Sequence, residues 1–200
     1  SEWHRKQFCS VFPSLEDKAS VISYGIDPSI FPEKEVEEYS FIYPSFPNRG
    51  LLPLLQMFPK IVEKYPTAKL HVFCDTKQDW VQETFKEQMD LIDSLLLEQT
   101  ENVINHGWVN GETLREYWSK AHIWLYPCLF EETCCLTSFE AAASKTLTIT
   151  NGLAALKENT CNGIIVYGNP LDEGWQILAL NRLFNILDGK DTEPYIERNF

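Results

Sequence analysis

The sequence has few basic residues, and they form no cluster. Lysine and arginine together number 17, against 29 aspartates and glutamates, so the formal net charge is −12 and the pI is near 4.8. Proteins that bind a nucleic-acid duplex or an anionic membrane present a basic surface to it. The composition therefore argues against both partners. A phosphate-bearing ligand would have to be small and held by local hydrogen-bond donors.

Long apolar runs are absent as well, and so are the cysteine spacings of common zinc sites. No run reaches the length of a membrane span, and Ser1–Lys6 lacks the apolar core of a signal peptide. We therefore expect a cytoplasmic protein with no membrane span in this segment. No Cys-x-x-Cys occurs. The candidate zinc ligands are His122, Cys128 and Cys134, and they lie on different expected elements. We expect six reduced thiols, no metal and no cofactor.

What the sequence does contain is an alternation of strand-like and helix-like segments, typical of an α/β, Rossmann-like, doubly wound parallel sheet. Its 200 residues, 44% of them hydrophobic, suit one domain with a buried core. The expected strands are Ala19–Ser23, Ser40–Tyr43, Leu70–Cys74, Val103–His106, Ile123–Tyr126, Thr146–Thr150 and Gly163–Tyr167. The expected helices are Leu51–Tyr65, Trp80–Gln99, Thr113–Lys120, Leu136–Ser144 and Glu173–Leu187. We assign residues 1–200 to this one domain, with 1–18 and 188–200 as peripheral segments.

Three polar clusters of the chain follow expected strands. They are Pro44–Gly50, His106-Gly107 and Pro127–Thr133. In an open parallel sheet, ligands bind at the carboxyl ends of the strands. The fold prediction therefore implies that these three clusters converge on one edge of the sheet.

The most informative stretch is Phe130–Ala143. It places Glu132 just before an expected helix start and Glu140 eight residues later, on nearly the same helical face. The free N–H groups of a helix start bind anions. Phe139 and Ala141–Ala143 make this helix apolar, so a carboxylate at Glu140 needs a defined partner. Two acceptors for sugar hydroxyls beside a phosphate cradle indicate a nucleotide-sugar site.

Arg49 stands just before another expected helix. A cation there meets the positive end of the helix dipole, and a bound anion would remove that conflict. Arginine can also grip phosphate oxygens in a bidentate way. His106 is either a satisfied turn histidine or a contact to a base, and Gly107 is expected to permit a positive φ or a close ligand approach.

Four segments match, in order and rough spacing, one known pattern: Val21–Asp27 with Phe31, Asn48–Leu51, Asn102–Val109 and Pro127–Ala143. Together they resemble the C-terminal, donor-binding half of a retaining group 1 glycosyltransferase with the GT-B architecture. The resemblance extends from Val21 to about Leu187. Its last segment carries the Glu-x₇-Glu signature of that family.

The resemblance implies roles for the residues of the signature. Glu132 would accept hydroxyls of the donor sugar, and Glu140 would accept the ribose hydroxyls. The backbone N–H groups of Thr133, Cys134 and Cys135 would hold the diphosphate. The substrate would be a nucleotide diphosphate sugar, and neither a metal nor another cofactor would be needed.

The resemblance also assigns the other two polar clusters. Arg49, followed by Gly50, would neutralise the diphosphate, while His106 and Gly107 would lie near the base or the ribose. In such enzymes the active site is a cleft between two halves, so an N-terminal half, absent from this sequence, would bind the glycan, lipid or protein acceptor.

The chain departs from the family pattern in the register of the first carboxylate and in the residues after the second strand, besides having Lys145 and Leu147 where the family often has Gly and Pro. Counting from Pro127 selects Glu131 as the first carboxylate, whereas counting back from Glu140 selects Glu132. We take Glu132, because a helix fixes its spacing while a loop can absorb an extra residue, and keep Glu131 in reserve. Where the family has Gly-Arg after its second strand, this chain has Pro44 and Ser45, so one cation is missing.

Two alternative functions remain open from the sequence. One is a nucleotide-sugar epimerase of the same two-half architecture, which would change the sugar without an acceptor. The other is a non-catalytic nucleotide-binding module, which the missing cation at Pro44-Ser45 favours.

Overall fold

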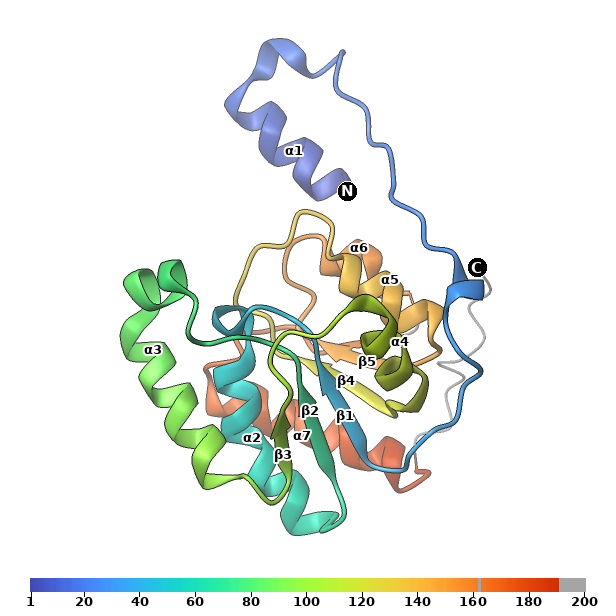
Figure 1. Ribbon diagram of the computed structural model, residues 1–200. Coiled ribbons are helices and arrows are strands. Elements are labelled where there is room, and N and C mark those ends of the chain that lie inside the picture. Colours follow the sequence, from blue (N-terminus) through green and yellow to red (C-terminus); the bar gives the residue numbers. More distant parts are fainter. Residues whose placement is uncertain (162, 191–200) are drawn as a thin grey trace.

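A computed structural model describes residues 1–161 and 163–190, and its centre is a parallel sheet (Figure 1). The strands run in the order β3-β2-β1-β4-β5-β6, and each neighbouring pair is parallel. This confirms the predicted α/β, Rossmann-like class. The strand bounds are β1 Ser40–Tyr43, β2 Lys69–Val72, β3 Val103–Asn105, β4 Ile123–Tyr126, β5 Leu147–Thr150 and β6 Gly163–Ile165.

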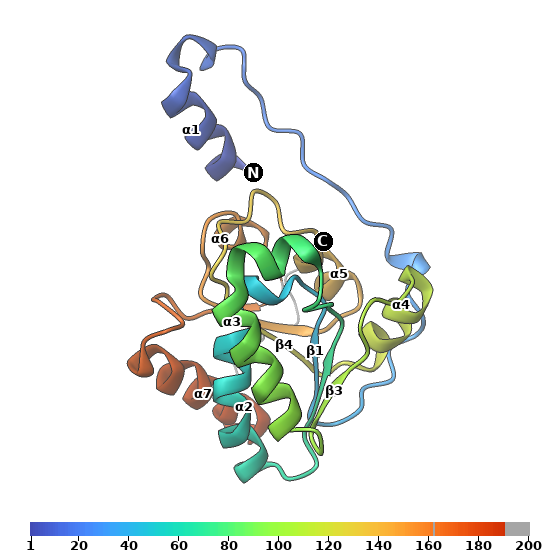
Figure 2. The same cartoon turned by 60° about the vertical axis from the view of Figure 1, so that its left-hand side comes forward.

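Helices cover both faces of the sheet. Figure 2 shows α2, α3 and α7 on one side and α4 and α5 on the other. The helix bounds are α1 Glu2–Val11, α2 Leu51–Lys64, α3 Asp79–Glu98, α4 Gly111–Lys120, α5 Leu136–Ala143, α6 Leu156–Asn159 and α7 Glu173–Leu187. Five of the seven were predicted, with ends within two residues. Among the described residues, no helix combines the length and apolarity that crossing a membrane requires.

The apolar residues of α2 gather on one face of the helix, and that face is buried. Leu51, Leu54 and Phe58 have no exposed surface. The helix continues through Pro59 as one element. Strands β1 and β4 are buried along their whole length, which fits continuous apolar runs covered on both faces.

The predicted strand Ala19–Ser23 is wrong. The structure has an extended, unpaired segment there, and Ile22 is 89% exposed. β3 and β6 form the two edges of the sheet, and residues 19–23 pair with neither of them. An apolar run becomes a strand only where a neighbour accepts its backbone hydrogen bonds.

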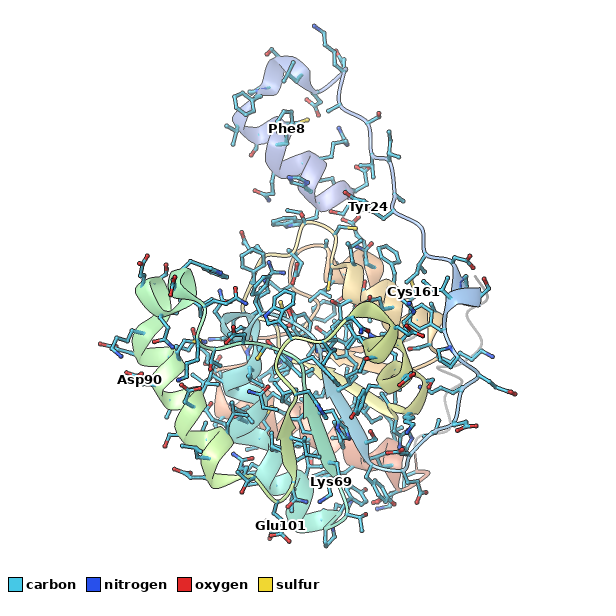
Figure 3. All side chains as sticks on the ribbon, in the orientation of Figure 1. Phe8, Tyr24, Lys69, Asp90, Glu101 and Cys161 are labelled. Carbon is cyan, nitrogen blue, oxygen red and sulfur yellow. The ribbon has the colours of Figure 1, made fainter. Side chains whose placement is uncertain are left out.

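The sequence prediction also missed α1. In Figure 1 this helix and the segment that follows it stand away from the sheet, and Figure 3 shows Phe8 far from the core. The start of the chain nevertheless reaches the loop between β4 and α5, because the Ser1 hydroxyl donates to the Thr133 carbonyl at 2.7 Å. Lys69 and Glu101, also labelled in Figure 3, mark the opposite, amino end of the sheet.

The strand order reverses direction between β1 and β4. The chain moves outward from β1 to β3 and then returns to place β4 on the other side of β1. Ligand sites of open α/β sheets lie at such a switch point, beyond the carboxyl ends of the strands. The loops after β1 and β4 are therefore the place to look for a site.

Candidate functional site

The loops after β1 and β4 bring Arg49 and Glu132 into contact. Arg49 ends the short 3₁₀ turn η3 (Pro47–Arg49), and Glu132 lies in the loop between β4 and α5. The Nη1 atom of Arg49 donates to both carboxylate oxygens of Glu132, at 3.1 and 3.2 Å. Glu132 is 6% exposed, so this ion pair is largely shielded from water. Two of the three predicted polar clusters thus converge.

This pair changes the interpretation of Arg49. The sequence suggested that a bound anion would resolve the conflict between a cation and the start of α2. The structure shows that the Glu132 carboxylate already does so. Two aromatic rings fix the guanidinium from the sides, with Phe46 and Phe130 centroids 5.1 and 4.3 Å away.

Gly50 lets the β1 loop approach the β4 loop. Its φ is +153°, and a Cβ atom there would lie 2.5 Å from the Pro127 carbonyl oxygen. We expect Gly50→Ala to lower the free energy of unfolding by about 2–3 kcal/mol, measured by urea denaturation. Gly174→Ala in α7 is the matched control, since a Cβ there meets nothing within 4 Å. Equal stability of the two variants would contradict this explanation.

Two buried tyrosines hold the ion pair in place. The Tyr126 hydroxyl donates to Glu132 at 2.9 Å, and the Tyr43 hydroxyl donates to the Phe46 carbonyl at 2.8 Å. Burial raises the pKa of both phenols well above the ordinary value, so both remain donors near neutral pH. Glu132 therefore receives hydrogen bonds from Arg49 and Tyr126, as a buried carboxylate requires.

Next to Glu132, the backbone offers three consecutive free donors. The N–H groups of Thr133, Cys134 and Cys135 donate to none of the described residues. Cys135 has a left-handed conformation, with φ 54°, and is the N-cap residue of helix α5. Successive free N–H groups that end in a left-handed residue at a helix start form a concave anion site. These are the donors that the resemblance assigns to a diphosphate.

A cavity of about 220 Å³ opens beside Arg49 at the carboxyl ends of β1, β2 and β3. It is large enough for part of a small ligand. Its walls combine aromatic and aliphatic side chains with one charged group, Arg49. The lining residues are Pro44, Ser45, Phe46, Arg49, Phe73, Cys74, Trp108, Val109, Leu114 and Thr137.

Glu140 lies on α5, one helical turn after Thr137, which lines the cavity. Residues three apart are neighbours on a helix surface, although Glu140 itself is not one of the lining residues. Glu140 is half-buried. Burial raises the pKa of its carboxyl, an effect that the Trp118 indole and the Arg115 guanidinium partly offset.

The reserve candidate, Glu131, is placed differently from its neighbour. Its side chain is exposed, whereas Glu132 is buried against Arg49 and Tyr126. Of the two adjacent carboxylates, the one selected by counting back from Glu140 is the one that the structure turns toward Arg49.

His106 does not reach the Arg49–Glu132 pair. Its Nε2 lies 3.0 Å from Nδ1 of His71, and its ring stacks on Phe73 with 4.7 Å between centroids. Burial lowers the pKa of both histidines, to about 4 for His71, where the neighbouring His106 adds to the effect. His106 thus contacts Phe73, which lines the cavity, but is not itself a lining residue. Gly107 has the positive φ that was predicted, 65°.

The cysteines near the site are thiols with raised pKa values. Burial raises the pKa of Cys128 to about 11 and that of Cys135 well above its ordinary value. All six cysteines are free, as expected. Across residues 1–161 and 163–190, no group of three or more histidine, cysteine, aspartate or glutamate side chains is placed to hold a metal ion.

Several side chains of the site were not predicted from the sequence. Phe46, Tyr126 and Phe130 surround the ion pair, and Trp108 lines the cavity. Each lies within the polar clusters or directly beside one. Their position after a strand was a usable signal, but an aromatic residue there is equally compatible with a core role.

Comparisons with known proteins point to one family. A family model described as "Glycosyl transferases group 1" matches residues 40–180. An uncharacterized glycosyltransferase of Methanocaldococcus jannaschii is 24% identical, over 86% of this chain and 47% of the relative. The chain therefore spans about half the length of this curated relative.

Solved structures show the same fold at low identity. HepE of Anabaena, solved in complex with UDP and glucose, is 16% identical over 91% of this chain and 51% of its own, with a TM-score of 0.65. The C-terminal domain of a group 1 family protein from Francisella tularensis is 18% identical, over 83% of this chain and 90% of that domain, with a TM-score of 0.61.

Proposed function

The chain belongs to the group 1 glycosyltransferase family, and on that premise we propose that it is the donor-binding half of an enzyme that transfers a sugar from a nucleotide diphosphate sugar to an acceptor. The observation that carries this proposal is the row of free N–H groups at Thr133–Cys135, which directly follows Glu132, the partner of Arg49. The solved complex of HepE with UDP and glucose supports a nucleotide-sugar donor.

Each group of residues in the site would bind a different part of the nucleotide-sugar donor. The nucleoside would occupy the cavity, with its ribose hydroxyls donating to Glu140. The diphosphate would accept from the three N–H groups and from Arg49. Glu132 would accept hydroxyls of the sugar. Fixed donors aimed at the diphosphate stabilise the negative charge that develops on it as the sugar leaves.

The same donors support transfer without a divalent cation. Three backbone N–H groups and a guanidinium would supply the electrostatic stabilisation for which other enzymes use a metal ion. We propose retention of the anomeric configuration, on the resemblance to retaining enzymes. We also propose that a second half of the protein binds the acceptor. The chain covers about half the length of its curated relative, but most of the length of an isolated C-terminal domain.

Calorimetric titration with UDP, GDP and their 2′-deoxy analogues tests this proposal. We expect one of the two diphosphates to bind, about tenfold more tightly than its 2′-deoxy analogue. Glu140→Gln should abolish this preference for the ribonucleotide. Glu116→Gln, an exposed carboxylate on α4, is the matched control and should retain the preference. If neither diphosphate binds at millimolar concentration, the proposed function is wrong. If Glu140→Gln keeps the preference, only the ribose assignment is wrong.

A further inference from the structure

The loop that carries the free N–H groups is anchored through its carbonyl groups. The N–H of Ala155 donates to the Glu132 carbonyl at 3.0 Å, and the side-chain amide of Asn159 donates to the Cys134 carbonyl. The carbonyl between them, that of Thr133, accepts from the Ser1 hydroxyl at 2.7 Å. Three consecutive carbonyls therefore all have partners.

These anchors decide where the N–H groups point. In a trans peptide the carbonyl and the following N–H lie on opposite sides, and the structure contains no cis peptide among its described residues. Holding the carbonyls of residues 132, 133 and 134 therefore turns the N–H groups of Thr133, Cys134 and Cys135 the other way. None of those three N–H groups has an acceptor among the described residues.

Helix α6 and the residue before it supply most of this anchoring. Ala155 and Asn159 lie one turn apart and hold the first and last of the three carbonyls. Glu158, between them, accepts from the N–H groups of Glu2 and Trp3 at 2.7 and 2.6 Å and so holds the start of α1. From there, the Ser1 hydroxyl donates to the middle carbonyl, that of Thr133.

The last residue of the loop shows that this conformation is not the relaxed one. Cys135 is a non-glycine residue with φ 54°, a conformation that costs free energy unless the surroundings impose it. Its carbonyl is fixed by Ser138, whose N–H and hydroxyl donate to it at 3.0 and 2.7 Å. On the N-terminal side of Cys135, the side chain of Asn159 holds the carbonyl of Cys134. The strained residue is therefore held by a side chain on each side.

We propose that Asn159 is a positioning residue for the donor diphosphate. It acts through the Cys134 carbonyl and never touches the ligand. Its amide keeps the peptide between Cys134 and Cys135 oriented so that the Cys135 N–H faces the phosphate. This inference rests on the proposed function and adds to it a residue outside the Glu-x₇-Glu signature.

A role in positioning predicts a selective loss of binding. If Asn159 only stabilised the fold, its removal would weaken nucleoside and nucleotide binding together or neither. If it orients the N–H row, the diphosphate loses an aligned donor while the nucleoside, held in the cavity, loses nothing. The ratio of the two affinities therefore separates the two roles.

The experiment measures dissociation constants by calorimetry for whichever of UDP and GDP binds more tightly, and for its nucleoside. We expect Asn159→Ala to weaken diphosphate binding about tenfold and to leave nucleoside binding unchanged. Asn159→Leu keeps the volume of the amide without its donor and should behave alike, which covers a failure of the alanine variant to fold. Asn102→Ala is the matched control, since its amide donates to the Pro66 and Ala68 carbonyls at the amino end of the sheet.

The outcomes distinguish this inference from the proposal beneath it. A wild-type chain that binds neither diphosphate overturns both. A wild-type chain that binds one of them, with Asn159 variants that keep the wild-type ratio of diphosphate to nucleoside affinity, overturns only the positioning role. The same loss of ratio in Asn102→Ala also overturns it, because the effect would then follow from general destabilisation.

Discussion

Arg49→Ala is expected to weaken binding of the preferred nucleoside diphosphate by about 100-fold, as measured by calorimetry. Arg49 is the charged residue among those that line the cavity, and hydrogen bonds to a charged group contribute about 1.5–3 kcal/mol. The substitution also leaves the buried Glu132 carboxylate without its cation. That uncompensated negative charge opposes a diphosphate brought close to it.

The two contributions can be separated. The double variant Arg49→Ala with Glu132→Gln removes the opposing charge, and should recover part of the lost affinity. Lys86→Ala changes the net charge equally on the outer face of α3, where Lys86 pairs with Asp90, and should bind as the wild type does. Wild-type affinity in Arg49→Ala would show that the guanidinium serves the fold alone.

Glu132→Gln is expected to remove the preference for a nucleotide sugar over the corresponding diphosphate. The carboxylate accepts from Arg49 and Tyr126 at once, and an amide in its place directs an N–H₂ group at one of these donors. We expect the free energy of unfolding to fall by about 1–3 kcal/mol for the same reason. Competition calorimetry with sugar-bearing and sugar-free nucleotides measures the first effect, and urea denaturation the second.

Glu131→Gln provides the control within the same loop. Glu131 is exposed and adjacent, so its substitution changes the net charge equally without touching the ion pair. We expect wild-type stability and wild-type preference for the sugar. A larger effect at Glu131 than at Glu132 would reverse the assignment of the first carboxylate in the Glu-x₇-Glu signature.

The buried strands and α2 could be predicted from the sequence because their patterns are strong and local. The apolar runs at Ile123–Tyr126 and Ser40–Tyr43 are compatible with few structures other than a buried strand. Ala19–Ser23 has the composition of a strand but no partner beside it in the sheet, and composition cannot reveal whether a partner is available. Helix α1 is polar in overall composition, and Cys9 is its one buried residue.

The candidate site was predictable where topology alone brings residues together. Arg49 and Glu132 each follow a strand, so the parallel sheet places both at its carboxyl edge, and the structure shows them in contact. Asn159 carried no such signal. Its partner is a backbone carbonyl, which every residue possesses, and the contact depends on the path of two loops. His106 was placed near the site by the same topology, yet its ring turned toward His71 and Phe73.

The adjacency of β1 and β4 also has a consequence for how the protein reaches its native state. Arg49 and Glu132 are separated by 83 residues, and the strands β2 and β3 lie between them in the chain. Long loops must close before such contacts form, and contacts of high sequence separation slow folding. Ligand-binding competence should therefore emerge in the last cooperative step, after the local helices have formed, and no fragment that ends before β4 can possess it.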